Sequence, residues 1–556
     1  MTQFPPTDPL KDQFLRFKLG IVVNGSLSKG LDIKLDPDVP IESVKVGQYV
    51  VVEPATPTGQ SLGRFFCVVS DLRLDATDPA LASSPPDLSN PIVAQVIHGT
   101  ATYGVAHVVP YLMQTSEGLR PVRTIPAHYA SAAEATQEQV EAVFGADDAD
   151  HLWIGSPLDM ESTLIRLDLP RLVERSVGVF GKSGTGKTFL TRILMAGILQ
   201  KRAAVQLIFD MHNEYGWAGT SEGPSGGAVK GLKQLFGSQV AVFTLDEASS
   251  RNRGVSTDGV IEIGYDEIEP GDIETMAETL NLTDIQTQIV PMLADRGRKS
   301  WLADFLERQA SDLADYAKEL GAHEGTLSAL WRKLQTIKRL HFVAPHVREP
   351  AVRTIIDYLE RGKTVVLEFG RYKDNPIAQV LVANLLSRRI YDEWSRRMEQ
   401  ALGDRSKEPS QLVITIEEAH KFLSPSIASQ TIFGTIAREM RKYNVTLLVV
   451  DQRPSAIDNE VLSQIGTKLA CLLDDEKDVN SILQGASGAG ELRSVLQRLE
   501  SKQQALIFGH AVPMPVVIRV RDYGTETSYA EFGFRDAATL QRTAERDASL
   551  LFGPPR

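Results

Sequence analysis

Eight residues, Gly181 to Thr188, have types and a spacing that suit phosphate chemistry, because they match the pattern G-x-x-x-x-G-K-[ST]. An apolar run precedes them and an amphipathic run follows, an order that predicts a strand, a loop and a helix. Glycines allow backbone N–H groups to wrap a polyphosphate, Lys187 neutralises the β and γ phosphates, and the Thr188 hydroxyl binds Mg²⁺. The alternative is a glycine turn without a ligand. The residues expected to bind the nucleotide are Gly181, Lys182, Ser183, Gly184, Thr185, Gly186, Lys187, Thr188 and Phe189.

A second pattern, an apolar strand that ends in two acids, lies at residues 412–420. Glu417 is placed to hold the hydration shell of Mg²⁺, and Glu418 to orient and deprotonate the water that attacks the γ phosphate. The alternative is a strand that ends in a solvated Glu pair. Because the pair follows a phosphate-binding loop with strands in between, we interpret Glu418 as the general base and Glu417 as the metal residue.

Two further strands carry polar residues at their carboxyl ends, where a parallel sheet forms its nucleotide crevice. Gln452 follows one apolar run and is expected to sense the γ phosphate or the attacking water; an ordinary loop glutamine is the alternative. Asp210 ends another run and is expected to support Mg²⁺ or water from the second shell of ligands. His212 and Glu214 follow at the same edge. His212 is expected to be structural or a relay, because a lone histidine gives no zinc signature.

Three arginines are candidates for stabilising charge on the γ phosphate, a role often filled from a neighbouring subunit. Arg441 is the first candidate and Arg438 the second, both on a predicted helix between the two catalytic strands. Arg175, just before the nucleotide strand, is the third. A solvated helix face or an ordinary salt bridge is the alternative for each of them.

The elements that must position these residues alternate between strand and helix from residue 164 onward, which predicts a mainly parallel sheet covered on both faces. The predicted strands are Ser176–Phe180, Ala204–Asp210, Val240–Leu245, Thr364–Phe369, Gln411–Glu417 and Thr446–Gln452. A largely helical insertion lies between the third and fourth of them. Its amphipathic segments are Asp284–Leu293, Trp301–Glu319 and Thr326–Leu340.

Short β-rich runs at close intervals occupy residues 13–125 and predict a small barrel. An Ala/Glu-rich segment, Ser131–Gly145, predicts a helix after it. The expected division is a barrel at 1–125, a linker and helical segment at 126–163, an ATPase core at 164–265 and 358–525, a helical insertion at 266–357, and a helical tail at 526–556.

The bulk composition is that of a globular protein with several domains, with 42% hydrophobic and 23% charged residues in 556. No stretch approaches the roughly 18 apolar residues of a membrane span. The first residues also lack a signal pattern, so we expect a cytoplasmic protein. Cys67 and Cys471 have no metal-type spacing. The net charge of −12 argues against a globally basic surface, but it allows a basic channel inside an acidic ring.

The order of these motifs resembles the HerA family of DNA translocases, which belong with the FtsK-type motor ATPases. The resemblance covers nearly the whole chain and implies an α/β fold with a RecA-like P-loop ATPase core. One departure is Glu417, where the family commonly has Asp. The shared order is a barrel, the phosphate-binding loop, Asp-x-His-x-Glu-Tyr at 210–215, a helical insertion, Glu-Glu-Ala-His at 417–420, Arg-x-x-Arg-Lys at 438–442 and Gln-Arg-Pro-Ser at 452–455.

The resemblance implies a homohexameric ring that hydrolyses ATP with Mg²⁺ between subunits and drives double-stranded DNA through its centre. It also implies a NurA-type nuclease as partner in DNA end processing and recombinational repair. The alternative is a HerA-like ring that scaffolds or activates another effector in anti-phage defence, with the barrel as docking platform. A secretion-type ATPase is a third possibility, weakened by the absence of membrane segments.

Most candidate DNA contacts lie in or just after the Gly-rich stretch Gly216–Gly231, which is suited to a pore loop, and one more, Lys421, follows the strand that ends in two acids. A solvated loop is the alternative for all of them. The candidates are Ser221, Ser225, Lys230, Lys233 and Lys421.

Overall fold

The computed structural model describes residues 18–54, 63–84, 86–91, 93, 97–158, 160–220, 228–348, 350–428, 431–486, 488–500 and 502–534. Ser221, Ser225 and residues 535–556 of the predicted tail lie outside the described residues. The chain divides into two compact units. The barrel unit comprises Met1–Asp168 and Thr467–Arg521, and the core unit comprises Leu169–Gly466 and Asp522–Arg556. The domain boundaries expected from the sequence stay a prediction, because the two compact units begin and end at other residues than the predicted domains.

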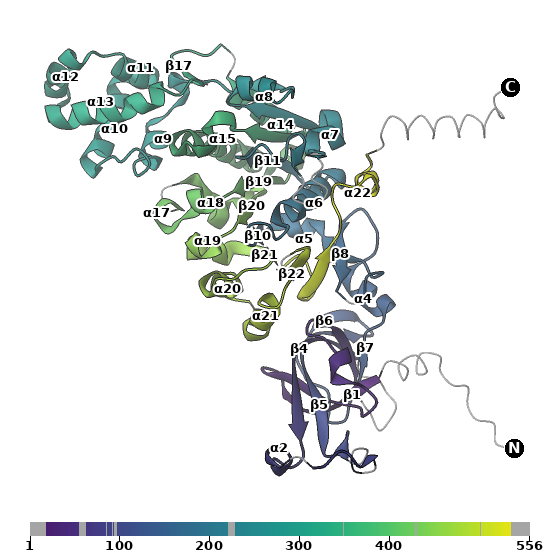
Figure 1. Ribbon diagram of the computed structural model, residues 1–556. Helices are drawn as coiled ribbons and strands as arrows, with labels where there is room; N and C mark the ends of the chain where they lie inside the picture. The colour runs from purple at the N-terminus through teal and green to yellow at the C-terminus, as the bar shows by residue number, and fades with distance from the viewer. Residues whose placement is uncertain are drawn as a thin grey trace, which may run out of the picture. The chain divides into compact units, whose positions relative to one another are not determined.

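The first seven strands form one antiparallel sheet (Figure 1). They are β1 (Lys18–Ser26), β2 (Gly30–Leu35), β3 (Tyr49–Glu53), β4 (Arg64–Ala76), β5 (Thr102–Thr115), β6 (Gly118–Pro121) and β7 (Ser131–Glu134). The order is β2-β1-β7-β3-β4-β5-β6, and β2 also pairs with β5, so the sheet closes into a barrel with β6 outside the ring. Inward-facing apolar side chains such as Val50, Val52 and Cys67 are fully buried. The predicted small N-terminal barrel is confirmed.

The predicted helix Ser131–Gly145 is wrong in its first part. Residues 131–134 form β7, which pairs with both β1 and β3 and completes the barrel. Ala132 and Ala133 are buried there, since their small side chains fit beneath the neighbouring strands and tertiary packing overrides their helix propensity. The helix begins only at α4 (Gln137–Phe144), where Thr136 and Gln139 form a capping box.

A second, mainly antiparallel group of strands completes the barrel unit. Each successive pair in the order β21-β22-β23-β8-β9 is antiparallel. The elements are β8 (His151–Pro157), β9 (Ile165–Asp168), β21 (Ile465–Ala470), β22 (Gln504–Gly509) and β23 (Val516–Val520), with helices α2 (Ala80–Ser83), α20 (Glu476–Leu483) and α21 (Ala489–Leu496).

The core unit is built on a parallel sheet in the order β15-β14-β18-β11-β19-β20-β10. Its strands are β10 (Ser176–Phe180), β11 (Val205–Asp210), β14 (Val240–Thr244), β15 (Gly259–Val260), β18 (Thr364–Glu368), β19 (Leu412–Glu417) and β20 (Val445–Asp451). Every residue of β10, β11, β19 and β20 is buried, as expected for a sheet covered on both faces. The predicted RecA-like α/β core is confirmed.

Helices cover both faces of this sheet, and Figure 1 shows α6 on one side and α15 and α18 on the other. The helix α15 begins at Pro376, which fits the first helical turn, and the Asn375 side chain caps it. The helices of the core unit outside the insertion are α5 (Leu169–Glu174), α6 (Lys187–Gln200), α7 (Leu232–Phe236), α8 (Glu247–Asn252), α14 (Ala351–Glu360), α15 (Pro376–Ala401), α16 (His420–Leu423), α17 (Pro425–Ala428), α18 (Ile432–Glu439), α19 (Asn459–Gln464) and α22 (Glu526–Glu531).

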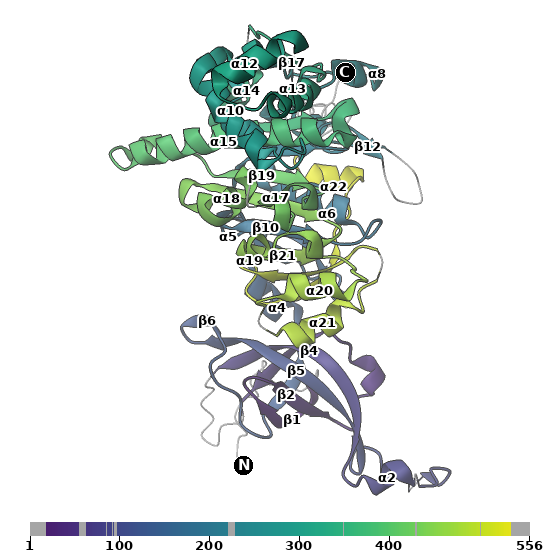
Figure 2. The same ribbon diagram turned by 90° about the vertical axis from the view of Figure 1, so that its left-hand side faces the viewer.

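The insertion between β14 and β18 is largely helical, and Figure 2 shows its helices gathered together. It contains α9 (Pro270–Thr275), α10 (Asp284–Gly297), α11 (Trp301–Leu306), α12 (Leu313–Leu320) and α13 (Glu324–Lys338). The segment Trp301–Glu319, predicted as one helical stretch, is broken between α11 and α12. The Gln335 amide of α13 donates a hydrogen bond to the Leu306 carbonyl at 2.9 Å. It thereby pairs a carbonyl at the C-terminal end of α11 that has no partner within that helix. Short strands complete the unit: β12 (Gly219–Thr220), β13 (Ala228–Val229), β16 (Ile263–Gly264) and β17 (Val343–Ala344).

Among the described residues, no helix combines the length and the apolar character needed to cross a bilayer.

Candidate nucleotide site

The phosphate-binding loop joins the end of β10 to the start of α6. Gly184 and Gly186 have φ angles of 78° and 94°, in the left-handed region that favours glycine. The Thr185 hydroxyl donates to the Lys182 carbonyl at 2.8 Å and closes the turn. Among the described residues no side chain caps the N-terminus of α6, so its first backbone N–H groups have no side-chain acceptor there. A helix start of this kind is an anion site, and Lys187 stands in its first turn.

Four parallel strands bring acids to the edge at which this loop lies. The strands β11, β18, β19 and β20 end at Asp210, Glu368, Glu417 and Asp451. Asp451 is level with Phe180, the last residue of the phosphate-loop strand. Because carboxyl ends of parallel strands share one edge, the fold gathers acids from distant parts of the chain beside the loop.

Glu417 is buried and only one of its carboxylate oxygens is hydrogen-bonded. The Tyr215 hydroxyl donates to Oε1 at 2.6 Å, whereas Oε2 has no partner in the described part of the chain. Burial raises the pKa of Glu417 to about 8, and the nearby Asp210 adds to this effect, while Lys187 opposes it. A divalent cation relieves such crowding of acids, and Mg²⁺ in phosphate sites needs one or two carboxylates. The free Oε2 and the Thr188 hydroxyl therefore fit a Mg²⁺ ion bound with the nucleotide phosphates.

Glu418 follows in a conformation that is unusual for a residue with a side chain, with a φ of 47°. The Gln452 amide donates a hydrogen bond to its Oε1 at 3.1 Å. The side chain of Glu418 is 22% exposed, so water can reach it. The structure thus brings the predicted base and the predicted sensor together.

Asp210 uses both oxygens to fold the loop that follows β11. It accepts hydrogen bonds from the backbone N–H groups of Glu214 at 2.8 Å, Tyr215 at 2.8 Å and Gly216 at 3.2 Å. This turn carries Tyr215 to Glu417, so Asp210 supports Glu417 through the loop. His212 is exposed, which gives no sign of a relay role. The sequence did not predict a role for Tyr215, although this residue closes the motif that Asp210 opens.

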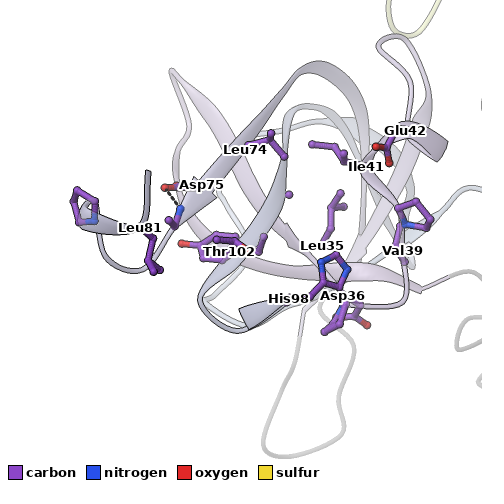
Figure 3. A pocket seen from close by; sticks show the side chains of 17 residues that line it. Leu35, Asp36, Val39, Ile41, Glu42, Leu74, Asp75, Leu81, His98 and Thr102 are labelled. Carbon is purple, nitrogen blue, oxygen red and sulfur yellow. Dashed lines mark hydrogen bonds between the residues drawn. The ribbon is translucent and has the colours of Figure 1, made fainter. Parts of the chain in front are cut away.

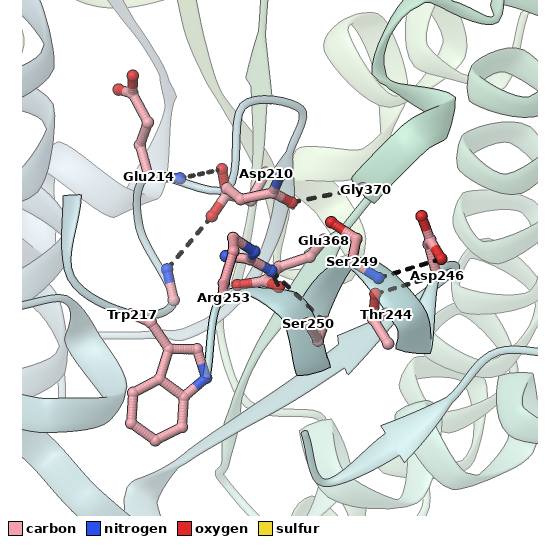
Figure 4. A network of polar contacts seen from close by, with 12 residues as sticks. Asp210, Glu214, Trp217, Thr244, Asp246, Ser249, Ser250, Arg253, Glu368 and Gly370 are labelled. Atoms are coloured by element: carbon pink, nitrogen blue, oxygen red, sulfur yellow. Dashed lines mark hydrogen bonds and ion pairs between the residues drawn. The ribbon is translucent and has the colours of Figure 1, made fainter. Parts of the chain in front are cut away.

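A buried ion pair lies beside Asp210 and was not expected from the sequence (Figure 4). Arg253 pairs with Glu368, whose side chain is fully buried at the end of β18. One strand further, Asp246 accepts from the Arg371 guanidinium at 3.0 Å. No sequence motif marks these pairs, because they join residues more than a hundred positions apart.

Two of the arginine candidates lie at the opposite edge of the sheet from the phosphate-binding loop. Arg175 directly precedes β10, and Arg441, in the short 3-10 helix Met440–Tyr443, precedes β20. The five residues of β10 span about 16 Å at roughly 3.3 Å per residue, so neither residue reaches phosphates bound to its own chain. Arg441 pairs with Glu174, and Arg438 lies 3.5 Å from Glu460.

The segment that contains Tyr523 and Tyr529 packs near the phosphate-loop helix α6 through aromatic contacts. Phe189, the residue after Thr188, has its ring 6.3 Å from that of Tyr523. The Tyr523 hydroxyl donates to the Lys230 carbonyl at 2.7 Å, and the Lys230 N–H donates to the Tyr529 hydroxyl at 2.8 Å. The predicted ATP contact Phe189 is therefore packed against the segment that ends the described chain.

Two of the candidate DNA contacts among the described residues interact with other side chains of the chain. The Lys230 ammonium lies 4.7 Å from the centre of the Phe534 ring, and Lys233 pairs with Asp258 at 2.9 Å. Lys421 is half-buried in α16.

The barrel unit contains a cavity of about 650 Å³, shown in Figure 3. Leu35, Ile41 and Leu74 are among its apolar lining residues, and Glu42 and Asp75 add acidic groups. The cavity lies between the β2–β3 connection and the long β4–β5 hairpin. All of its lining residues belong to the barrel unit.

The chain is similar to several known proteins. Residues 152–390 match the family model described as "Helicase HerA, central domain". The chain is 22% identical over 436 residues to "DNA double-strand break repair helicase HerA" of Pyrococcus furiosus, covering 74% of this chain and 76% of that protein. It is 23% identical over 400 residues to the protein of the same name from Saccharolobus solfataricus, covering 70% and 72%. A similar solved structure is the bacterial conjugative coupling protein TrwB, with 10% identity, a TM-score of 0.46, and coverage of 71% of this chain and 94% of that one.

The fold and the site define a P-loop ATPase with a RecA-like core, because a glycine-rich loop, a helix start and an acidic strand end meet at one edge of a parallel sheet. Within this class, residues 152–390 are similar to the HerA central domain, and about 70% of the chain is similar to the named HerA helicases.

Proposed function

We propose that this protein is an ATP-driven translocase or helicase of double-stranded DNA. The observation that carries the proposal is Glu418, held by Gln452 beside the free oxygen of Glu417 at the edge of the phosphate-binding loop. The named relatives are DNA double-strand break repair helicases, which supports DNA as the polymer on which the motor acts.

In this mechanism Lys187 holds the β and γ phosphates, and Thr188 and Glu417 would hold Mg²⁺. The bound ion would neutralise charge on the phosphate oxygens. Glu418 accepts the proton of a water whose oxygen bonds to the γ phosphorus, while the bond to the ADP oxygen breaks. Gln452 orients Glu418 and senses the γ phosphate.

The active form is proposed to be a homohexamer, because the chain alone places Arg441 and Arg175 too far from its own phosphates. A neighbouring subunit whose amino edge faces this carboxyl edge supplies the missing guanidinium. DNA runs through the central channel, and a NurA-type nuclease cuts the ends that the motor delivers, in the cytoplasm.

A second candidate function is a ring that scaffolds or activates an effector in anti-phage defence. The cavity of the barrel unit favours it, since an apolar pocket with acidic groups at its border suits a partner segment with apolar and basic side chains. Tracking of single labelled DNA molecules separates the two functions. Directional movement that needs hydrolysis supports the motor, and static ATP-dependent assembly supports the scaffold.

The central test measures ATP hydrolysis with and without double-stranded DNA. We expect DNA to stimulate the wild type, Lys187→Ala to abolish hydrolysis, and Glu418→Gln to lower kcat by about 100-fold or more. Glu247→Gln, an exposed glutamate in α8, is the matched control and should be unaffected. Assembled rings whose ATPase is insensitive to Glu418→Gln would contradict the mechanism.

A further inference from the structure

Asp451, the last residue of β20, connects three parts of the ATPase site. Its fully buried carboxylate accepts the His420 backbone N–H at 2.7 Å and lies 3.0 Å from the His420 Nδ1. Its other oxygen accepts the Arg453 N–H at 2.7 Å. Its backbone carbonyl accepts the N–H of Gly181 at 3.3 Å. The phosphate-binding loop, the turn after β19 and the segment that begins with Gln452 therefore meet at this one residue.

The turn that Asp451 holds contains Glu418, whose left-handed backbone costs on the order of 1 kcal/mol for a residue with a Cβ. Such strain persists only where the surroundings fix it. The turn is anchored on one side by the end of β19 at Glu417. On the other side it is anchored by His420, which is bound to Asp451 through both backbone and side chain.

We propose that Asp451, acting through His420, is the positioning residue that keeps Glu418 aimed at the attacking water. The inference rests on the proposed ATP hydrolysis and adds two residues to it. Asp451 does not touch the reacting atoms, because its oxygens are taken by His420 and Arg453. His420 links it to the base, since its Nδ1 lies 3.8 Å from Oε2 of Glu418.

The charges of the pair support this assignment. Burial works to raise the pKa of Asp451, but hydrogen bonds from His420 and Arg453 outweigh it and lower the pKa. The Asp451 hydrogen bond in turn raises the pKa of His420. The carboxylate thus stays ionised and keeps its strong acceptor character toward the turn.

The positioning role differs in its consequences from that of a simple structural cap. A cap stabilises the fold, so its loss lowers stability, ATP binding and turnover together. A positioning residue is needed in the hydrolysis step, so its loss lowers kcat while ATP still binds. Binding is expected to survive because the hydrogen bond between Gly181 and Asp451 uses the backbone carbonyl of Asp451, which the substitution leaves in place.

The chain offers matched variants for the test. Asp451→Asn keeps the volume but replaces one acceptor oxygen by an amide nitrogen, which donates instead. His420→Asn places an amide nitrogen where Nδ1 stands, whereas His420→Gln places it where Nε2 stands. Asp246→Asn is the control, because Asp246 is also a buried acid after a strand end that accepts backbone N–H groups, but it lies four strands away.

The experiment measures kcat and KM for ATP in the full-length protein, the Kd of a fluorescent ATP analogue, and the thermal midpoint. We expect Asp451→Asn and His420→Gln to lower kcat about 100-fold, as a misplaced catalytic group does, with analogue binding retained. His420→Asn should keep most of the kcat, as should Asp246→Asn. In a Glu418→Gln background, Asp451→Asn should cause no further loss, since it acts through the missing group.

The proposal is overturned if the losses from Asp451→Asn and Glu418→Gln multiply, or if His420→Asn and His420→Gln behave alike. Should Asp451→Asn fail to fold, the comparison of kcat between His420→Asn and His420→Gln tests the proposal by itself. Wild-type turnover in the Glu418→Gln variant would be a different result. It would show that Glu418 is not the base, and so would contradict the proposed mechanism of ATP hydrolysis itself.

Discussion

Tyr215 and Glu417 meet across 202 positions of sequence, and their hydrogen bond shows what motifs leave out. The motifs predicted the loop, Glu417, Glu418 and Gln452, because their types and spacing follow from phosphate chemistry. The partners that hold them, Tyr215 and Asp451, depend on which strands become neighbours. That order is set by packing of the whole sheet and cannot be inferred from local spacing.

Removal of the Tyr215 hydroxyl should weaken the metal site without emptying it. In Tyr215→Phe the buried Glu417 loses its one hydrogen bond, and groups that orient metal ligands typically contribute about 10- to 100-fold to affinity. We expect the Mg²⁺ concentration for half-maximal ATPase to rise by about tenfold or more. Tyr391→Phe on α15, outside the site, is the control, and an unchanged Mg²⁺ dependence would argue against Glu417 as metal residue.

At the level of elements, the buried parallel strands were predicted within one or two residues, because short continuous apolar runs bounded by polar residues are typical of strands covered on both faces. The errors fall where local composition and tertiary setting disagree. The alanines of β7 have a high helix propensity, but in the structure they are buried in a strand of the barrel. The break between α11 and α12 depends on a cap from α13, which the sequence of the segment does not contain.

The helix α18 offers a test of close packing behind the site. A Cβ on Gly434 would lie 1.9 Å from the Ala428 carbonyl oxygen, so Gly434→Ala should destabilise the core unit by about 1–3 kcal/mol. Gly490→Ala in α21 is the matched helical control, since nothing lies within 4 Å of its added Cβ, and it should stabilise slightly. Thermal unfolding measures both, and a neutral Gly434→Ala would contradict this packing.

For the whole molecule, the distance between the amino and carboxyl edges of the sheet makes a single chain an incomplete catalyst. Arg441 and Glu418 of one chain lie at opposite edges. A ring in which each interface joins unlike edges brings the two together.

This arrangement predicts complementation between inactive variants. We expect Arg441→Ala to lower kcat about 1,000-fold, as loss of a guanidinium in trans does. Mixed with Glu418→Gln, it should regain activity, because in random rings about a quarter of the interfaces combine an intact Glu418 with an intact Arg441. Lys442→Ala, next to Arg441, should remain active alone. A mixture as inactive as its components would place the arginine role elsewhere.

The burial of the two cysteines determines how this protein can be labelled with a fluorophore. Cys67 and Cys471 are the only cysteines of the chain, and both are buried and outside any disulfide. Burial raises the pKa of the Cys67 thiol far above its usual range, which suppresses the thiolate that reacts with maleimide dyes. A cysteine introduced at Leu402, 89% exposed after the end of α15, would therefore carry a fluorophore selectively in the otherwise native sequence.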